Sequence, residues 1–313
     1  MPHDKVITVL GATGTQGGAV ARELLSSGEF GVRAVTRNAR SAKAQALAGL
    51  GAKVVEASLT DGASLRRALD GAHGAFLVTP YWEHRSPARE LTEVETFIGA
   101  ARSAGLRHVL WSTLEDTREA IKPEDPRMPF LEDGYRVPHF DVKGGRADAL
   151  FAESGLPVTY LLMSFYWDNL LTQPQRDPDG TLALHLPLED TPIAGVASED
   201  IGRVAHRVLQ DPSSTIGATV PVVGEYRTGA EMAAALSVAL GERVAYRPPT
   251  ADQYRNLAFP GAEELGNMFQ YYAEFPESYL GRRNLDAAHA INPDWLTLPD
   301  FLAAHRIAIT ANS

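Results

Sequence analysis

The sequence of 313 residues contains no cysteine. Disulfide bonds, thiolate metal ligands and cysteine nucleophiles are therefore excluded, and the composition suits a reducing cytoplasm. The nine histidines show no ligand pairing and there is no HExxH motif, so we expect neither a structural nor a catalytic metal. The GxSxG nucleophile elbow is also missing, which argues against a serine hydrolase of that type.

Long apolar runs and an excess of positive charge are missing too. No apolar stretch approaches the length needed to cross a membrane. Lys and Arg number 29 against 39 Asp and Glu, a formal net charge of −10, and no basic patch is interleaved with aromatic residues. We therefore expect neither direct nucleic-acid binding nor a membrane partner. Met1–Lys5 leads directly into an apolar segment, so we expect no signal peptide and a cytoplasmic protein.

The most informative stretch that is present begins at Val6. Val6–Leu10 has the length and β-branched content of a buried strand, and a helical pattern follows it. Between them, Gly11 permits a tight turn, Gly14 lets a pyrophosphate approach the backbone, and Gly17 lets the helix lie close to the sheet. This order predicts the first half of a dinucleotide-binding βαβ unit. The alternative, a glycine-rich turn that binds nothing, is less well supported because strand and helix flank the turn correctly.

The end of the second strand indicates which dinucleotide is bound. That strand is expected over residues 32–37 and ends at Arg37, with Arg40 and Lys43 close behind and no carboxylate nearby in the sequence. An arginine at this place accommodates the 2′-phosphate of NADP, whereas an acidic residue would hold the ribose hydroxyl of NAD. The sequence therefore favours NADP(H), and a solvated surface arginine is the alternative.

Strand-like and helical segments then alternate along the first half of the chain. The further strands are expected at Lys53–Ala57, Ala75–Thr79, His108–Ser112 and Pro157–Leu162, and the helices at Ser41–Leu50, Ser64–Asp70, Ala88–Ala104 and His139–Glu153. This order predicts an α/β fold, a Rossmann-like doubly wound parallel sheet with right-handed crossovers.

We expect two domains. Residues 1–163 form the nucleotide-binding domain, to which residues 195–224 return with a helix that opens at Ser198 and a strand at Ala218–Val223. Residues 164–313 form a smaller C-terminal α/β lobe with helices at Thr228–Leu240 and Glu263–Phe275. The last helix carries a cluster interpreted as core in preference to a substrate pocket or partner surface: Met268, Phe269, Tyr271, Tyr272 and Phe275.

Ligands of doubly wound sheets bind at the carboxyl ends of the strands. The positions expected there are Ser58 and Leu59 near the adenine, Thr79, Pro80, Tyr81 and Trp82 beside the ribose and nicotinamide, and Ser112 and Thr113 near the reactive ring. For Tyr81 and Trp82 a role in the core and a role in the site stay equally open.

Residues Leu114–Pro138 interrupt the alternation. Eleven of these 25 residues are charged and four are proline. A loop this long is mobile or functional, and its place after the fifth strand makes it a candidate lid. A surface insertion without a role is the alternative.

Several motifs, taken together in order, are specific. GATGTQGG, VRAVTRN, PHFDVKG and SFYWDNLL resemble the NmrA-like family of atypical short-chain dehydrogenases/reductases. FPGAEELGNMFQYY resembles the branch of that family that includes NADPH-sensing redox sensors. The resemblance covers residues from Val6 to about His305 and implies a Rossmann-like NADP-binding domain with a smaller C-terminal lobe.

The resemblance also implies site residues by motif match. The pyrophosphate loop carries over to Gly11, Thr13, Gly14, Gln16 and Gly17, the 2′-phosphate site to Arg37, and the lysine that holds the nicotinamide ribose to Lys143; Phe165 and Tyr166 of SFYWDNLL join the cofactor set. Two departures stand out. Ser58 occupies a position where relatives often have an aspartate near the adenine, and the Leu114–Pro138 loop is longer than the family leads us to expect.

The position of the catalytic tyrosine of ordinary short-chain dehydrogenases, four residues before the lysine, is His139. An imidazole is a competent general acid near neutral pH, but His139 can equally be a helix-start residue without chemistry. Two functions stay open. The favoured one is an NADP(H)-binding redox-sensing regulator of a protein partner, with little or no dehydrogenase activity. The other is an NADPH-dependent reductase of a small quinone, enone or aromatic substrate. A homodimer is left open.

Overall fold

The computed structural model describes residues 4–131 and 134–306. The chain divides into two compact units. The first comprises Met1–Asp116, His139–Met163 and Ser198–Val220, and the second comprises Thr117–Pro138, Ser164–Ala197 and Pro221–Ser313. Within the two described ranges, no helix is both long enough and apolar enough to cross a membrane.

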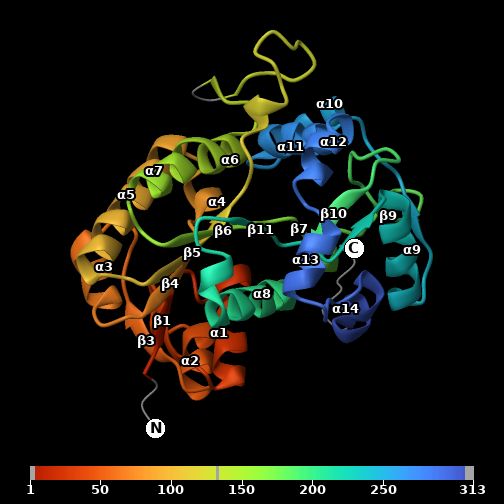
Figure 1. Ribbon diagram of the computed structural model, residues 1–313. Helices are drawn as coiled ribbons and strands as arrows, with labels where there is room; N and C mark the ends of the chain where they lie inside the picture. The colour runs from red at the N-terminus through yellow and green to blue at the C-terminus, as the bar shows by residue number, and fades with distance from the viewer. Residues whose placement is uncertain (1–3, 132–133, 307–313) are drawn as a thin grey trace. The chain divides into compact units, whose positions relative to one another are not determined.

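The first unit is built on a seven-stranded sheet of order β11-β6-β5-β4-β1-β2-β3 (Figure 1). Its strands are β1 (Val6–Val9), β2 (Gly31–Thr36), β3 (Lys53–Glu56), β4 (Gly74–Leu77), β5 (His108–Thr113), β6 (Val158–Leu162) and β11 (Thr219–Pro221). Strands β1 to β6 pair in parallel, with Val9 of the central β1 opposite both Ala34 and Phe76. The predicted doubly wound parallel sheet is confirmed, and the strand expected at Ala218–Val223 is its edge strand β11.

Helices cover both faces of this sheet. They are α1 (Thr15–Ser27), α2 (Ala42–Gly49), α3 (Gly62–Leu69), α4 (Tyr81–His84), α5 (Pro87–Ala104), α6 (Pro138–Asp141), α7 (Asp148–Glu153) and α8 (Ser198–Gln210), with the short turn η5 (Pro212–Ser214). Figure 1 shows α3, α5 and α7 on one side of the sheet and α1 and α8 on the other. Helix α8 lies so close to α1 that a Cβ at Gly202 would lie 2.7 Å from the carbonyl oxygen of Ala19.

The helix expected over His139–Glu153 is not continuous. A π-helical turn, η3 (Val142–Ala147), separates α6 from α7. Gly144 and Gly145 lie in this turn, and glycine is among the weakest helix formers. A Cβ at Gly144 would also overlap the backbone between Leu114 and Asp116, so the turn passes directly over the chain that leaves β5.

The second unit contains two three-stranded sheets of order β12-β10-β7 and β13-β9-β8. The strands are β7 (Phe165–Tyr166), β8 (Gln175–Arg176), β9 (Leu182–Leu184), β10 (Ile193–Val196), β12 (Glu225–Arg227) and β13 (Val244–Tyr246). The helices are η1 (Thr117–Glu119), η4 (Trp167–Leu171), α9 (Gly229–Leu240), α10 (Ala251–Arg255), α11 (Ala262–Glu274), α12 (Pro276–Gly281), α13 (Leu285–Ile291) and α14 (Leu298–Ala304). On α11, Met268, Phe269, Tyr271 and Tyr272 are buried, which supports their interpretation as core.

The charged segment Thr117–Pro138 falls in this second unit, whereas the sequence analysis kept it within residues 1–163. Its described part is held by α11, because the Asn267 side-chain amide donates to the carbonyl oxygens of Pro129 and Arg136 at 2.9 and 2.7 Å. Asn267 is fully buried. These are contacts between segments far apart in the sequence, so composition and loop length did not reveal them.

Candidate functional site

The glycine loop has the geometry that its spacing predicts. Gly11 adopts φ +67°, a conformation that favours glycine, and a Cβ at Gly17 would overlap the carbonyl oxygen of Gly11. Gly14 is the N-cap of α1, its N–H donates to the carbonyl of Gly11 at 2.9 Å, and within the described chain no side chain caps the helix start. The first turn of α1 carries no acidic residue. An anion can therefore reach the helix N-terminus, where it is stabilised by backbone N–H groups.

Arg37 follows β2 and is paired with a carboxylate that the sequence analysis did not anticipate. Both of its terminal nitrogens donate to Glu83, at 2.5 and 2.8 Å, and this pairing raises the pKa of Arg37. Glu83 belongs to α4, which follows β4. The expectation that no carboxylate lies near Arg37 is therefore wrong in three dimensions, because parallel strands bring their carboxyl ends to one edge of the sheet.

Lys143 lies in the π-helical turn and is almost completely buried. Its ammonium group contacts the Glu90 carboxylate and the Thr79 hydroxyl, and Thr79 also donates to Glu90. The ammonium group lies 4.8 Å from the centre of the Trp111 ring, a cation–π contact. The side chains of Thr79, Glu90 and Lys143 therefore form a buried group just after β4, and the first two hold the Lys143 ammonium group in place.

Asp148, the first residue of α7, is a second, partly buried carboxyl group near Lys143. Its Oδ1 accepts from Trp111 Nε1 at 2.7 Å and from the Thr113 hydroxyl at 2.8 Å. Burial raises the pKa of Asp148 to about 7, although these hydrogen bonds and the charge of Lys143 act in the opposite direction. Its charge therefore changes near neutral pH. The sequence analysis did not single out this residue.

His139 lies among aromatic rings. It is 4% exposed, with its ring centre 4.7 Å from that of Trp82 and 5.7 Å from that of Tyr81. Tyr81 is buried at 2%, whereas Trp82 is 45% exposed. The structure therefore supports a core position for Tyr81, whereas Trp82 is partly accessible.

The remaining predicted positions follow from the strand ends. Ser58 and Leu59 come after β3, and Thr79 and Pro80 come after β4. Ser112 is the last residue but one of β5, and its side chain is buried. Ser58 bonds the hydroxyl of Thr60 at 2.8 Å, and Leu59 packs against the apolar core. Phe165 and Tyr166 form β7 of the second unit, and their contact with a cofactor stays a prediction.

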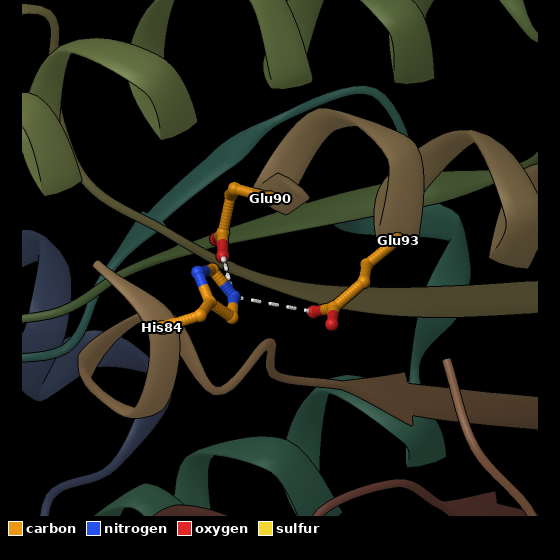
Figure 2. A group of neighbouring side chains, drawn as sticks. All are labelled: His84, Glu90 and Glu93. Atoms are coloured by element: carbon orange, nitrogen blue, oxygen red, sulfur yellow. Dashed lines mark ion pairs between the residues drawn. The ribbon is translucent and has the colours of Figure 1, made fainter. Parts of the chain in front are cut away.

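A further cluster, His84, Glu90 and Glu93, was missed by the sequence analysis. Figure 2 shows the imidazole of α4 facing two carboxylates of α5, with His84 Nε2 3.8 Å from Glu90 and 3.6 Å from Glu93. These distances exceed hydrogen-bond length, and within the described ranges Nε2 and the two facing oxygens make no hydrogen bond. The signal that could have found the cluster is the pair of glutamates three residues apart on one helix, close behind a histidine.

The three side chains could hold a metal ion by proximity, but the histidine has the wrong tautomer for it. The backbone N–H of Ser86 donates to His84 Nδ1 at 3.1 Å, so the proton of the neutral ring is on Nε2, which faces the carboxylates. A metal-bound histidine has the reverse arrangement, in which its second nitrogen donates. Lys143 and Arg89 already contact Glu90 and Glu93, so cations balance both carboxylates. We assign no metal here.

The glycine loop, the parallel sheet and Arg37 at the end of β2 define a Rossmann-like protein of the dinucleotide-binding type. The NmrA-like family model matches residues 3–302, and the chain belongs to this family.

Two relatives and one solved structure illustrate the range of the family. The chain is 27% identical to an NmrA-like family domain-containing oxidoreductase, FrzB of Cladobotryum sp, over 85% of this chain and 83% of the relative. It is 30% identical to an NAD(P)H azoreductase of Xenophilus azovorans, over 98% and 100%. The crystal structure of NmrA, a negative transcriptional regulator, matches with a TM-score of 0.78 at 22% identity, over 96% and 94% of the two chains. The last likeness concerns the fold alone.

Proposed function

We propose that this protein binds NADP(H) and reduces a small conjugated acceptor, such as a quinone, an enone or an azo compound. One observation carries the proposal: the glycine loop follows β1, Arg37 follows β2, and the Lys143 ammonium group contacts Thr79, which follows β4, so these groups gather at the carboxyl edge of one parallel sheet. Glycine keeps this loop tight, since a Cβ at Gly17 would overlap the carbonyl oxygen of Gly11, and the uncapped start of α1 fits a pyrophosphate.

Each of these groups has a defined task in the proposal. Backbone N–H groups at the start of α1 bind the pyrophosphate, the Arg37 guanidinium binds the 2′-phosphate, and Lys143 holds the nicotinamide ribose. The bound dinucleotide supplies a hydride. Lys143 is suited to a positioning task because Glu90 and Thr79 already fix its ammonium group.

A conjugated acceptor suits the surroundings of His139. A simple ketone leaves a strongly basic oxyanion after hydride addition and depends on a well-placed acid. A quinone or enone leaves a delocalised, weakly basic anion and depends on it less. His139 contacts the rings of Tyr81 and Trp82, and the exposed part of Trp82 offers aromatic surface to a substrate. The activities in the names of FrzB and the azoreductase give independent support.

The second candidate is the redox-sensing regulator that the sequence favoured. Its supporting observation is His139 itself, which replaces the expected tyrosine and is 4% exposed. In this candidate, occupancy by NADP(H) changes the affinity for a protein partner and no substrate is turned over. NmrA, whose fold this chain shares, is a negative transcriptional regulator, which makes this candidate specific enough to test.

A turnover assay separates the two candidates. The absorbance of NADPH is followed with a panel of azo dyes, quinones and enones, with the variant Arg37→Ala as a control that weakens the cofactor site. Turnover that depends on Arg37 supports the reductase. Tight NADPH binding by calorimetry without turnover of any acceptor supports the regulator, and absence of NADPH binding contradicts both.

A further inference from the structure

The Arg37–Glu83 pair has a consequence for cofactor choice. Two parallel hydrogen bonds join the guanidinium to the carboxylate, which is the fork geometry that arginine also uses for a phosphate. Both side chains are exposed, at 67% for Arg37 and 49% for Glu83. Exposed ion pairs contribute little to stability, so a ligand can replace this one at small cost.

Glu83 is held in this position by the short helix α4. The Glu83 N–H donates to the carbonyl of Pro80 at 2.9 Å, and the Tyr81 side chain of the same turn is buried. Arg85 ends the helix with φ +50°, a left-handed conformation that is uncommon for a residue other than glycine. Glu83 thus belongs to a hydrogen-bonded turn, and its carboxylate contacts Arg37 at the end of β2.

We infer that Glu83 is a specificity-determining residue that opposes NADP(H) and favours NAD(H). This inference rests on the proposed function, which assigns Arg37 to the 2′-phosphate. The two terminal nitrogens of Arg37 cannot serve the Glu83 carboxylate and a phosphate in the same fork. NADP(H) must therefore either displace Glu83 from this fork or bind the remaining N–H donors of Arg37, and in both cases a carboxylate lies beside a dianionic phosphate. The 2′-hydroxyl of NAD(H) is neutral and can donate to Glu83 while the pair stays intact.

The variant Glu83→Gln tests this inference in the intact protein. It keeps the size of the side chain and removes its charge. Calorimetry with NADPH and NADH is expected to show NADPH binding about twofold to fivefold tighter than in the wild type, the range that an exposed ion pair corresponds to, and NADH binding no tighter. The matched control is Glu95→Gln, which removes one exposed charge from α5 and is expected to bind both dinucleotides as the wild type does.

A second comparison assigns the effect to Arg37. In an Arg37→Ala background, Glu83→Gln is expected to change NADPH affinity less than it does in the wild type. Unchanged NADPH affinity in Glu83→Gln, or equal tightening of both dinucleotides, overturns the inference while the proposed function stands. If Arg37→Ala binds NADPH as tightly as the wild type, the phosphate assignment in the proposed function is wrong and the inference fails with it. Thermal unfolding of each variant confirms that it is folded.

Discussion

Two ion pairs at the same edge of the sheet differ in almost every physical respect. Arg37 and Glu83 meet with exposures of 67% and 49%, whereas Lys143 and Glu90 meet with exposures of 8% and 0%. Water and salt compete with the first pair, so it can exchange one anion for another. The second pair lies in a low dielectric and cannot be opened without leaving a buried charge. Cofactor specificity can therefore change at the exposed pair, whereas the buried pair fixes the position of Lys143.

The largest effect should come from breaking the buried pair. Glu90→Ala leaves Lys143 buried without its carboxylate, and we expect the free energy of unfolding to fall by about 3–5 kcal/mol. Arg37→Ala breaks the exposed pair and should change it by less than about 1 kcal/mol. Urea unfolding of both variants gives the comparison. The double variant Glu90→Leu/Lys143→Met should be more stable than Glu90→Ala, and similar small losses in both single variants would refute the contrast.

Asp148 provides a second test of what burial does to a charged group, because its raised pKa makes the free energy of unfolding depend on pH. Its pKa is raised to about 7 by burial, against about 3.9 in an unfolded chain, so between these values the folded state holds a proton that the unfolded state has released. The free energy of unfolding should therefore fall as the pH rises from about 4 to about 7, by up to about 4 kcal/mol, and level off above.

Asp148→Asn removes this titration and keeps the oxygen that accepts from Trp111 and Thr113. We expect its free energy of unfolding to lose that part of the pH dependence, measured by urea unfolding between about pH 5 and about pH 8. Parallel pH profiles for the wild type and the variant would contradict the raised pKa.

Cofactor affinity tests the exposed pair directly. Arg37→Ala should weaken NADPH binding by about 1.5–3 kcal/mol, because a charge-assisted hydrogen-bond fork to the phosphate is lost. NADH, which has no 2′-phosphate, should be affected much less. Calorimetry with both dinucleotides measures the difference. Equal losses for NADPH and NADH would place the 2′-phosphate away from Arg37.

The smallest effect is expected at His139. Replacement by Phe keeps a ring between Tyr81 and Trp82, so NADPH affinity should stay close to that of the wild type. Lys143→Ala, in contrast, should weaken NADPH and NADH binding together, since the ribose is common to both. If a reductase activity is found and His139→Phe abolishes it with affinity intact, His139 is the general acid and the regulator candidate fails.

The parts of the site that were predictable depend on neighbours in the sequence. Gly11, Gly14 and Gly17 follow a strand at fixed spacing, and the conformation of the loop is dictated within a few residues. The alternation of apolar strands and helices likewise predicted the parallel sheet. The unpredicted parts join residues far apart in the chain. Glu83 is 46 residues from Arg37, and Glu90 is 53 residues from Lys143.

The π-helical turn and the charged segment likewise depend on contacts between residues that are far apart in the chain. Gly144 and Gly145 weaken the helix locally, but the wider turn also depends on the close approach of Gly144 to the chain after β5, which the sequence does not reveal. The composition of Thr117–Pro138 suggested a loop, but only the folded chain shows that Asn267 binds two of its carbonyl groups. Whether this segment closes over a bound ligand stays a prediction.

The contact between α8 and α1 bears on how the protein is made. The first unit needs Ser198–Val220, which supplies the helix that covers α1 and the edge strand of the sheet. On a ribosome, residues 1–163 emerge well before that segment is synthesised, and α1 then lacks the apolar face formed by Ile201, Val204, Ala205 and Val208. Until the ribosome has synthesised the chain beyond residue 220, the nascent sheet lacks its edge strand and α1 remains uncovered. A fragment that ends at residue 163 would remain at that incomplete stage permanently, exposed to chaperones and proteases.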